Sequence, residues 1–162
     1  MGEINLARVD DRLIHGQVMT KWSKGLGTNA LFVIDNPTAK DSFMKDIFMM
    51  SAANSGMTIK VFSTDEAVEY WTKANFEKYR AILLFKSIAA VKEVIEKGLP
   101  IKKLNIGGIA KTKEAKFVIS SVGLKPSDAE LLKEIESKGV EVFFQTVPDT
   151  KALSLKDALK SF

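Results

Sequence analysis

The chain alternates short apolar runs with segments whose apolar residues recur at helical spacing. The runs at 30–34 and 81–85 contain no polar residue, which is typical of strands that are covered on both faces. We expect strands at residues 4–9, 30–34, 58–62, 81–85, 104–106 and 140–147, with 116–121 as an edge or antiparallel piece. The alternation predicts α/β architecture: a single doubly wound domain over residues 1–162, with a mostly parallel central sheet of about six to seven strands and helices on both faces.

Short polar signals mark the ends of several predicted helices. Ser63 and Glu66 have the spacing of a capping box. The same spacing recurs from Ser127 to Glu130, and Ser154 is expected to cap a short C-terminal helix over 153–162. These signals place helices between the predicted strands.

The segment from Asp35 to residue 53 carries two further expectations. Asp35 to Thr38 is predicted to turn the chain, because Pro37 and the residue before it disfavour helix. The helix expected over 41–53 places Phe43, Ile47 and Met50 on one face, which we expect to lie in the core. The alternative is an adaptable, methionine-rich binding surface.

Composition excludes several kinds of site. Cysteine is absent and histidine occurs once, so disulfides, thiolate sites, cysteine nucleophiles and multi-histidine zinc sites are excluded, and we expect no metal and no cofactor. The net charge is +4, but the lysines are scattered, so no nucleic-acid partner is expected. The N-terminus does not resemble a signal peptide and no run approaches the roughly 20 apolar residues of a membrane span, so a cytoplasmic protein is expected.

The densest group of reactive side chains directly follows the first predicted strand. Asp10, Asp11, Arg12 and His15 lie within six positions, and His15 is the only histidine. Ligands of doubly wound sheets collect at the carboxyl ends of strands. An arginine and the amides of a helix start favour an anion at this place.

Other strand ends carry secondary candidates for phosphate contact. Lys86 and Ser87 follow one predicted strand, and Gly107 and Gly108 follow another. Paired glycines permit close approach of a ligand or another chain. For Gly107 and Gly108 backbone geometry is the favoured explanation; for Lys86 and Ser87 a solvated lysine and a helix cap are equally good explanations.

Several roles for His15 fit the residues alone. It could pack or cap, act as a general base oriented by Asp10 or Asp11, or act as a nucleophile that accepts a phosphoryl group. A hydrolase or lyase using His15 with Asp11 and a non-catalytic anion sensor are therefore alternatives. Both are weakened because Gly-x-Ser-x-Gly, Gly-x-Gly-x-x-Gly and Walker-type motifs are absent.

Residues 9–18, Val-Asp-Asp-Arg-Leu-Ile-His-Gly-Gln-Val, resemble the phosphorylation-site signature of the IIB component of the bacterial sugar phosphotransferase system (PTS), mannose/fructose/sorbose type. Segments 84–87, 105–108 and 145–148 are also similar, and the resemblance extends over essentially the whole chain. It implies a phosphocarrier on which Nδ1 of His15 receives a phosphoryl group from a phosphohistidine of the IIA component. The group then passes to a sugar held by the membrane components IIC and IID, with which the protein would associate peripherally.

The remaining site residues receive roles within this resemblance. Arg12 is expected to clamp the phosphate, with donors from the amides near Gly16 and Gln17. One of Asp10 and Asp11 is expected to preset the loop or pair with Arg12, and the other to orient the imidazole.

Partner contacts follow from the net charge, which would favour a more acidic IIA. Arg8, Arg12, Lys21 and Lys24 are expected at the rim of that contact. The sequence does not specify the transported sugar or the oligomeric state, and a homo-oligomer stays one alternative.

Overall fold

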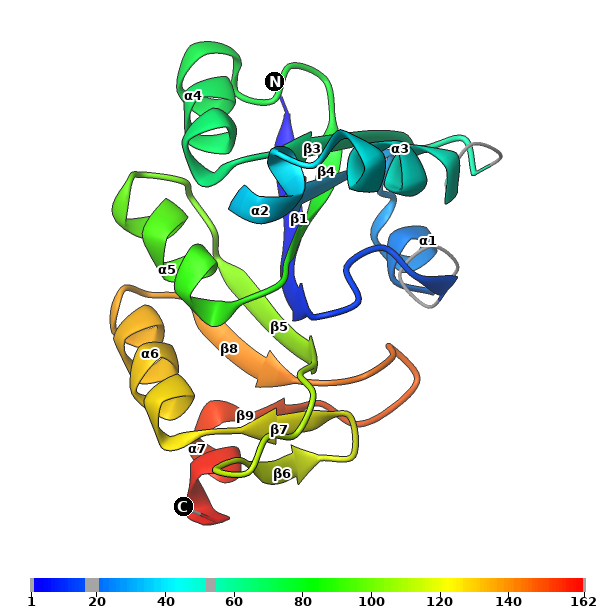
Figure 1. Ribbon diagram of the computed structural model, residues 1–162. Helices are drawn as coiled ribbons and strands as arrows, with labels where there is room; N and C mark the ends of the chain where they lie inside the picture. Colours follow the sequence, from blue (N-terminus) through cyan, green and yellow to red (C-terminus); the bar gives the residue numbers. More distant parts are fainter. Residues whose placement is uncertain (1, 17–20, 52–54, 162) are drawn as a thin grey trace.

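The structure is a computed structural model in which residues 2–16, 21–51 and 55–161 are described. A seven-stranded sheet has the strand order β3-β2-β4-β1-β5-β8-β9 (Figure 1). Its strands are β1 (Glu3–Asp10), β2 (Ala30–Ile34), β3 (Thr58–Phe62), β4 (Arg80–Phe85), β5 (Lys103–Gly108), β8 (Glu141–Phe144) and β9 (Leu153–Ser154). Every neighbouring pair is parallel except β8 and β9. The predicted mostly parallel sheet is confirmed.

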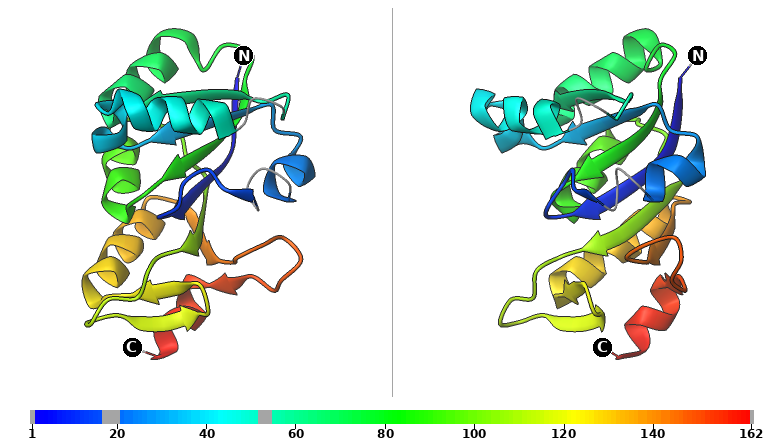
Figure 2. Two further views of the ribbon diagram at one scale, coloured as in Figure 1. Left: turned by 45° about the vertical axis from the view of Figure 1, so that its right-hand side comes forward. Right: turned by 90° about the vertical axis from the view of Figure 1, so that its right-hand side faces the viewer.

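Helices connect the strands. They are α1 (Ser23–Leu26), α2 (Asn36–Ala39), α3 (Ser42–Ser51), α4 (Thr64–Ala74), α5 (Ile88–Glu96), α6 (Pro126–Ser137), α7 (Leu155–Ala158) and the 3-10 turn η2 (Leu159–Ser161). In Figures 1 and 2, α4, α5 and α6 follow one another along one side of the sheet, and α1 lies on the other side. Within the described ranges, no helix combines the length and the apolar character needed to cross a bilayer.

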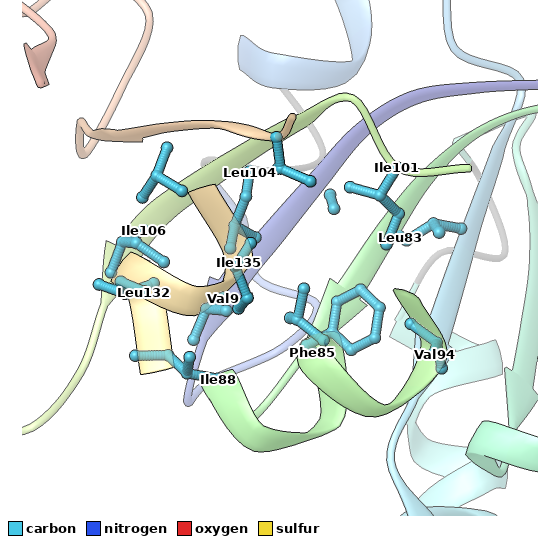
Figure 3. Packing of buried hydrophobic residues seen from close by; sticks show 14 of the residues in the cluster. Val9, Leu83, Phe85, Ile88, Val94, Ile101, Leu104, Ile106, Leu132 and Ile135 are labelled. Carbon is cyan, nitrogen blue, oxygen red and sulfur yellow. The ribbon is translucent and has the colours of Figure 1, made fainter. Parts of the chain in front are cut away.

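Apolar side chains cover both faces of the sheet. On one face Val9, Leu83 and Phe85 pack with Val94 of α5 and Leu132 of α6 (Figure 3). On the other face a second cluster is formed by sheet residues together with Trp22 and Phe48; its sheet members are Leu6, Leu31, Val33, Ile59, Ile82 and Leu84. Alternate residues of one strand thus serve opposite clusters, which explains why the central strands are apolar throughout.

Strand β1 holds the position that matters for function. It lies between β4 and β5, so the chain crosses over it when it passes from one to the other. The carboxyl end of β1 is therefore a topological switch point, where open α/β sheets form ligand sites. Residues 11–16 leave the sheet there.

One short element differs from the prediction at Asp35–Thr38. Residues 36–39 form helix α2 in place of the expected turn. The Asp35 carboxylate accepts hydrogen bonds from the backbone N–H and the hydroxyl of Thr38, at 3.2 and 2.6 Å. Pro37 lies in the first turn, where its missing N–H has no helical partner to lose. The prediction was wrong because it treated this proline as a helix breaker.

The predicted helix caps are confirmed in part. The capping box of Ser63 and Glu66 is confirmed at α4, and Ser154 caps α7. Helix α6 instead begins at Pro126, and the Asp128 carboxylate accepts the N–H of Lys125 at 3.2 Å. The predicted cap at Ser127 lies two residues after the observed N-cap, Lys125.

Several strands begin or end at other residues than predicted. The segment 116–121 contains β6 (Lys116–Ile119), which pairs antiparallel with β7 (Val122–Leu124), as the edge prediction allowed. Gly107 and Gly108 lie inside β5, not after it. The last predicted strand ends early, at Phe144.

Helix α3 exposes the residues that were expected in the core. Phe43, Ile47 and Met50 are 70%, 40% and 75% exposed, whereas Phe48 is buried. Because α3 packs beside β3, the edge strand of the sheet, only one narrow stripe of the helix meets the core. The core prediction for these three residues was wrong.

Candidate functional site

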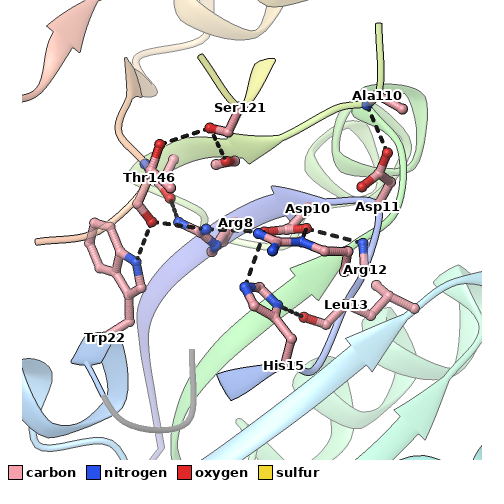
Figure 4. Close-up of polar contacts among 12 residues, drawn as sticks. Arg8, Asp10, Asp11, Arg12, Leu13, His15, Trp22, Ala110, Ser121 and Thr146 are labelled. Atoms are coloured by element: carbon pink, nitrogen blue, oxygen red, sulfur yellow. Dashed lines mark hydrogen bonds and ion pairs between the residues drawn. The ribbon is translucent and has the colours of Figure 1, made fainter. Parts of the chain in front are cut away.

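Asp10 is the centre of a polar network at the carboxyl end of β1 (Figure 4). Its side chain is fully buried. Oδ1 accepts the backbone N–H and the Nε–H of Arg12, both at 3.0 Å, and Oδ2 accepts Nη2 of Arg12 at 3.0 Å. Oδ2 also accepts Nη2 of Arg8 at 3.1 Å. A single carboxylate therefore pairs with two arginines.

Arg8 reaches this carboxylate from inside the sheet. Its side chain is fully buried, so the prediction of a rim contact for Arg8 was wrong. Its Nη atoms also donate to Oδ1 of Asn105 and to the carbonyls of Gln145 and Thr146. The guanidinium carbon lies 5.3 Å from the ring centroid of Trp22, a cation–π distance.

The imidazole of His15 stands beside Asp10. Nδ1 lies 3.0 Å from the carbonyl oxygen of Leu13, and Nε2 lies 3.5 Å from Oδ2 of Asp10. Nε2 is buried and has no hydrogen-bond partner among the described residues. Leu13 itself has a φ of +57°, and this left-handed turn brings its carbonyl back to the ring.

The charges around Asp10 shift its acidity. Burial alone would raise the pKa of the Asp10 carboxyl, but hydrogen bonds from Arg12 and the charges of His15 and Arg8 outweigh burial and lower the pKa. The bond to Asp10 raises the pKa of Arg12, while burial lowers that of Arg8. Asp10 is thus held as a carboxylate.

This shift predicts a pH dependence of stability. A carboxyl whose pKa is lower in the folded state stabilises the fold above its unfolded pKa of about 3.9, and the contribution is lost as the pH falls through the folded pKa. Urea unfolding between about pH 6 and pH 3 should therefore show a steeper loss in the parent protein than in Asp10→Asn, which lacks the titrating group. Parallel profiles for the two proteins would contradict the ion pairing of Asp10.

Asp11 has a different structural role from Asp10. Its Oδ2 accepts the N–H of Ala110 at 2.8 Å, and its own N–H donates to the carbonyl of Gly108 at 3.0 Å. Asp11 thereby ties the loop to the segment after β5. We expected one acid to preset the loop or pair with Arg12 and the other to orient the imidazole. In the structure Asp10 both pairs with Arg12 and lies beside the imidazole, whereas Asp11 holds the loop.

The remaining predicted residues surround this centre. A β-carbon on Gly107 would overlap with the guanidinium of Arg8, and one on Gly108 would lie 2.8 Å from Oδ1 of Asp10. Both glycines are buried in β5, where their missing side chains leave room for the two charged groups. This is the close approach that paired glycines allow.

Lys86 and Ser87 lie on a neighbouring hollow. Ser87 caps α5 by accepting the N–H of Ala90 at 3.2 Å, and Lys86 is exposed. Both line a hollow of about 320 Å³ with Ala110 and Lys125, and none of its described lining residues belongs to the loop at 10–16. No described hydrogen bond or ion pair joins these two residues to His15.

Gly16 follows His15 at the surface, and Gln17 lies outside the described residues, as do Val18 and Met19. No group of three or more histidine, aspartate or glutamate side chains suited to a metal occurs in the described part of the chain.

Sequence reasoning missed the buried half of the site. Arg8, Asn105 and Thr146 hold the network together across the sheet, and the indole N–H of Trp22 donates to the carbonyl of Thr146 at 3.1 Å. One signal was available: Arg8 is a charged residue at a fully buried strand position, where an arginine needs partners.

Comparison with known proteins shows that a described family matches almost the whole chain. The family described as "PTS system sorbose subfamily IIB component" matches residues 4–161. The sorbose-specific EIIB component of Lacticaseibacillus casei is 33% identical over 145 residues, covering 89% of this chain and 87% of the relative.

Solved structures agree. The crystal structure of manxB from Thermoanaerobacter tengcongensis has a TM-score of 0.92 and 41% identity, covering 100% of this chain and 98% of that one. The IIBSor domain of the sorbose permease from Klebsiella pneumoniae has a TM-score of 0.90 and 29% identity, covering 98% and 97%. The chain spans about half the length (48%) of the mannose-specific EIIAB components of Escherichia coli that it also matches.

Proposed function

Because the chain belongs to the sorbose subfamily of PTS IIB components, we propose that it is a phosphocarrier whose transient phosphoryl group is held by His15. IIB components are phosphotransferase components of sugar uptake that work with IIA and IIC partners. In this proposal a phosphohistidine of IIA is the donor, and a sugar bound to the membrane components IIC and IID is the final acceptor.

The observation that carries the proposal is the position of His15. The only histidine of a chain without cysteine stands at the switch point of the sheet, beside a carboxylate that two arginines hold in place. Phosphoryl transfer needs positioning and an electrostatic environment for the phosphoryl oxygens, with little further chemistry from the protein. Arg12 is half exposed and supplies that charge.

Nδ1 is the better acceptor atom. Nε2 is buried and faces Asp10, which favours a proton on Nε2 and repels a phosphoryl group there. The 3.0 Å contact between Nδ1 and the Leu13 carbonyl, which only accepts hydrogen bonds, belongs to the tautomer with its proton on Nδ1. Before transfer the ring gives this proton to solvent and takes one up on Nε2, so that Nδ1 carries the lone pair.

The transfer steps balance as two displacements at phosphorus. The Nδ1–P bond forms while the N–P bond of the IIA histidine breaks, and the departing imidazole keeps the electron pair. In the second step a sugar hydroxyl oxygen forms the O–P bond, the pair returns to Nδ1, and the hydroxyl proton passes to solvent. Donors for the phosphoryl oxygens would come from Arg12 and from the amides near Gly16 and Gln17.

The other site residues keep smaller roles. Asp10 orients the imidazole through Nε2, and Asp11 fixes the loop to the segment after β5. Lys86, Ser87, Gly107 and Gly108 are not assigned a phosphate contact. The protein is proposed to work in the cytoplasm, associated with the membrane permease through IIC and IID.

The alternative of a hydrolase or lyase built on His15 and Asp11 loses its geometric basis. The Asp11 carboxylate accepts the N–H of Ala110, and Asp10 is the acid beside the imidazole. A general base oriented by Asp11 is therefore not supported.

The test is phosphorylation of the purified protein by enzyme I, HPr and a cognate IIA with labelled phosphoenolpyruvate. We expect one phosphoryl group per chain that is labile in acid and stable in alkali, and that peptide mapping assigns to His15. The ¹⁵N chemical shifts of the ring should identify Nδ1 as the phosphorylated atom. No label from a IIA shown to be competent would contradict the carrier function, and label on Nε2 would contradict the choice of nitrogen.

A further inference from the structure

The two arginines that share Asp10 differ in how they are held. Arg8 is fully buried, and its guanidinium donates to Asn105, to two backbone carbonyls and to Asp10. A fully buried guanidinium with this many acceptors, 5.3 Å from the ring centroid of Trp22, cannot turn to another anion without breaking these bonds. Arg8 is therefore a stationary charge.

Arg12 has the opposite character. Its side chain is 50% exposed, and the two side-chain hydrogen bonds described for it both go to Asp10, each at 3.0 Å. The carboxylate also accepts the backbone N–H of Arg12, a bond that does not depend on where the guanidinium lies. The guanidinium can therefore leave Asp10 without breaking any other described side-chain contact (Figure 4).

The departure of Arg12 would be costly if Asp10 were left alone. A buried carboxylate without a partner is strongly unfavourable. Asp10 keeps the ion pair with Arg8 at 3.1 Å, the backbone N–H of Arg12 and the nearby imidazole of His15. One negative charge facing two arginines thus leaves one arginine free for a second anion.

We propose that Arg8 is a permanent counter-ion of Asp10, which allows Arg12 to exchange its bonds to Asp10 for bonds to the phosphoryl oxygens on His15. This inference rests on the proposed function. Arg8 is a positioning residue, because it acts through Asp10 and does not touch the phosphoryl group. When the phosphoryl group leaves, Arg12 returns to the Asp10 carboxylate. Its guanidinium charge, which stabilised the phosphorylated state, is then paired with Asp10 again.

The chain suits a direct test, because it contains three arginines. Their Nε–H groups give three NMR signals, and Arg80 is a built-in reference whose Nε donates to the carbonyl of Gly27 at 2.8 Å. Arg80 starts β4 and pairs with Glu3 at the start of β1, so it lies at the end of the sheet opposite to Asp10. On phosphorylation we expect the Arg12 signal to shift, while those of Arg8 and Arg80 stay. An unmoved Arg12, or an Arg8 that shifts with it, would overturn the exchange.

Variants of Arg8 test its contribution. In Arg8→Met, Arg12 is the sole arginine left for Asp10, so we expect phosphorylation by IIA to slow about 10- to 100-fold, by analogy with the loss when the hydrogen-bonded partner of a metal-ligating side chain is removed. Arg8→Lys keeps the charge but loses the fork of donors to the carbonyls, so a partial recovery of rate separates a counter-ion from a merely structural arginine. Arg80→Met is the matched control and should transfer at the parent rate.

The outcomes separate this inference from the proposed function. A folded Arg8→Met that is phosphorylated at the parent rate would refute the role of Arg8 and leave the carrier function standing. If a competent IIA does not phosphorylate the parent protein, inorganic phosphate serves as the anion instead. If phosphate addition shifts the Arg12 signal alone, the exchange is supported although the carrier function has failed. If no signal shifts, both the exchange and the carrier function are refuted.

Discussion

Replacing His15 with alanine is expected to abolish phosphorylation of the protein by IIA. The chain contains no second histidine and no cysteine, so no other imidazole and no thiolate is present to accept the phosphoryl group. The label transferred from phosphoenolpyruvate should fall to the background of the assay. The measurement is labelled phosphate retained per chain after removal of the donor proteins.

A suitable control keeps the loop in place. His15→Asn retains a side-chain N–H that can donate to the carbonyl of Leu13, the one hydrogen bond that the ring makes to the described residues. This variant should fold like the parent protein and still accept no label. Label of parent intensity on either variant would move the acceptor away from His15 and discard the proposed site.

Replacing Gly107 with alanine is expected to lower the free energy of unfolding strongly. The added methyl group would occupy the space of the Arg8 guanidinium, which cannot move without leaving Asn105, two carbonyls and Asp10. Breaking a buried ion pair costs about 3 to 5 kcal/mol, a large part of the roughly 5 to 15 kcal/mol by which domains are stable. The free energy of unfolding in urea measures the effect.

Gly25→Ala is the matched control for this substitution. Gly25 lies in α1, and a β-carbon there would meet no atom within 4 Å. The change should leave stability unchanged or raise it by up to about 1 kcal/mol, because alanine favours helix. If Gly107→Ala were as harmless as Gly25→Ala, the Arg8 guanidinium would not occupy the place described.

The two expectations that the sequence supported best depended on local pattern. Continuous apolar runs at 30–34 and 81–85 predicted strands that are covered on both faces, because alternate side chains of a strand point in opposite directions. The position of His15 after the first strand predicted a site at the carboxyl end of the sheet, and the strand order confirmed that this end is a switch point.

The errors came from features that depend on neighbours distant in the chain. The apolar face of α3 was assigned to the core, but α3 lies at the edge strand β3, and Phe43 and Met50 found no layer to cover them. A hydrophobic stripe shows that a face can be buried, whereas the sheet order decides whether a partner is there.

By itself, the sequence therefore determined the alternation of strands and helices, the end of the sheet that carries the reactive side chains, and the family to which the chain belongs. Only the tertiary structure decided which acid faces His15 and which arginine is buried. The hydrogen-bond partners of Arg8 other than Asp10 lie 97 to 138 residues further along the chain, and Gly107 is needed because Arg8 fills its side-chain space. Contacts of this kind have no local pattern, since they arise when the folding of the whole sheet brings separate strand ends together.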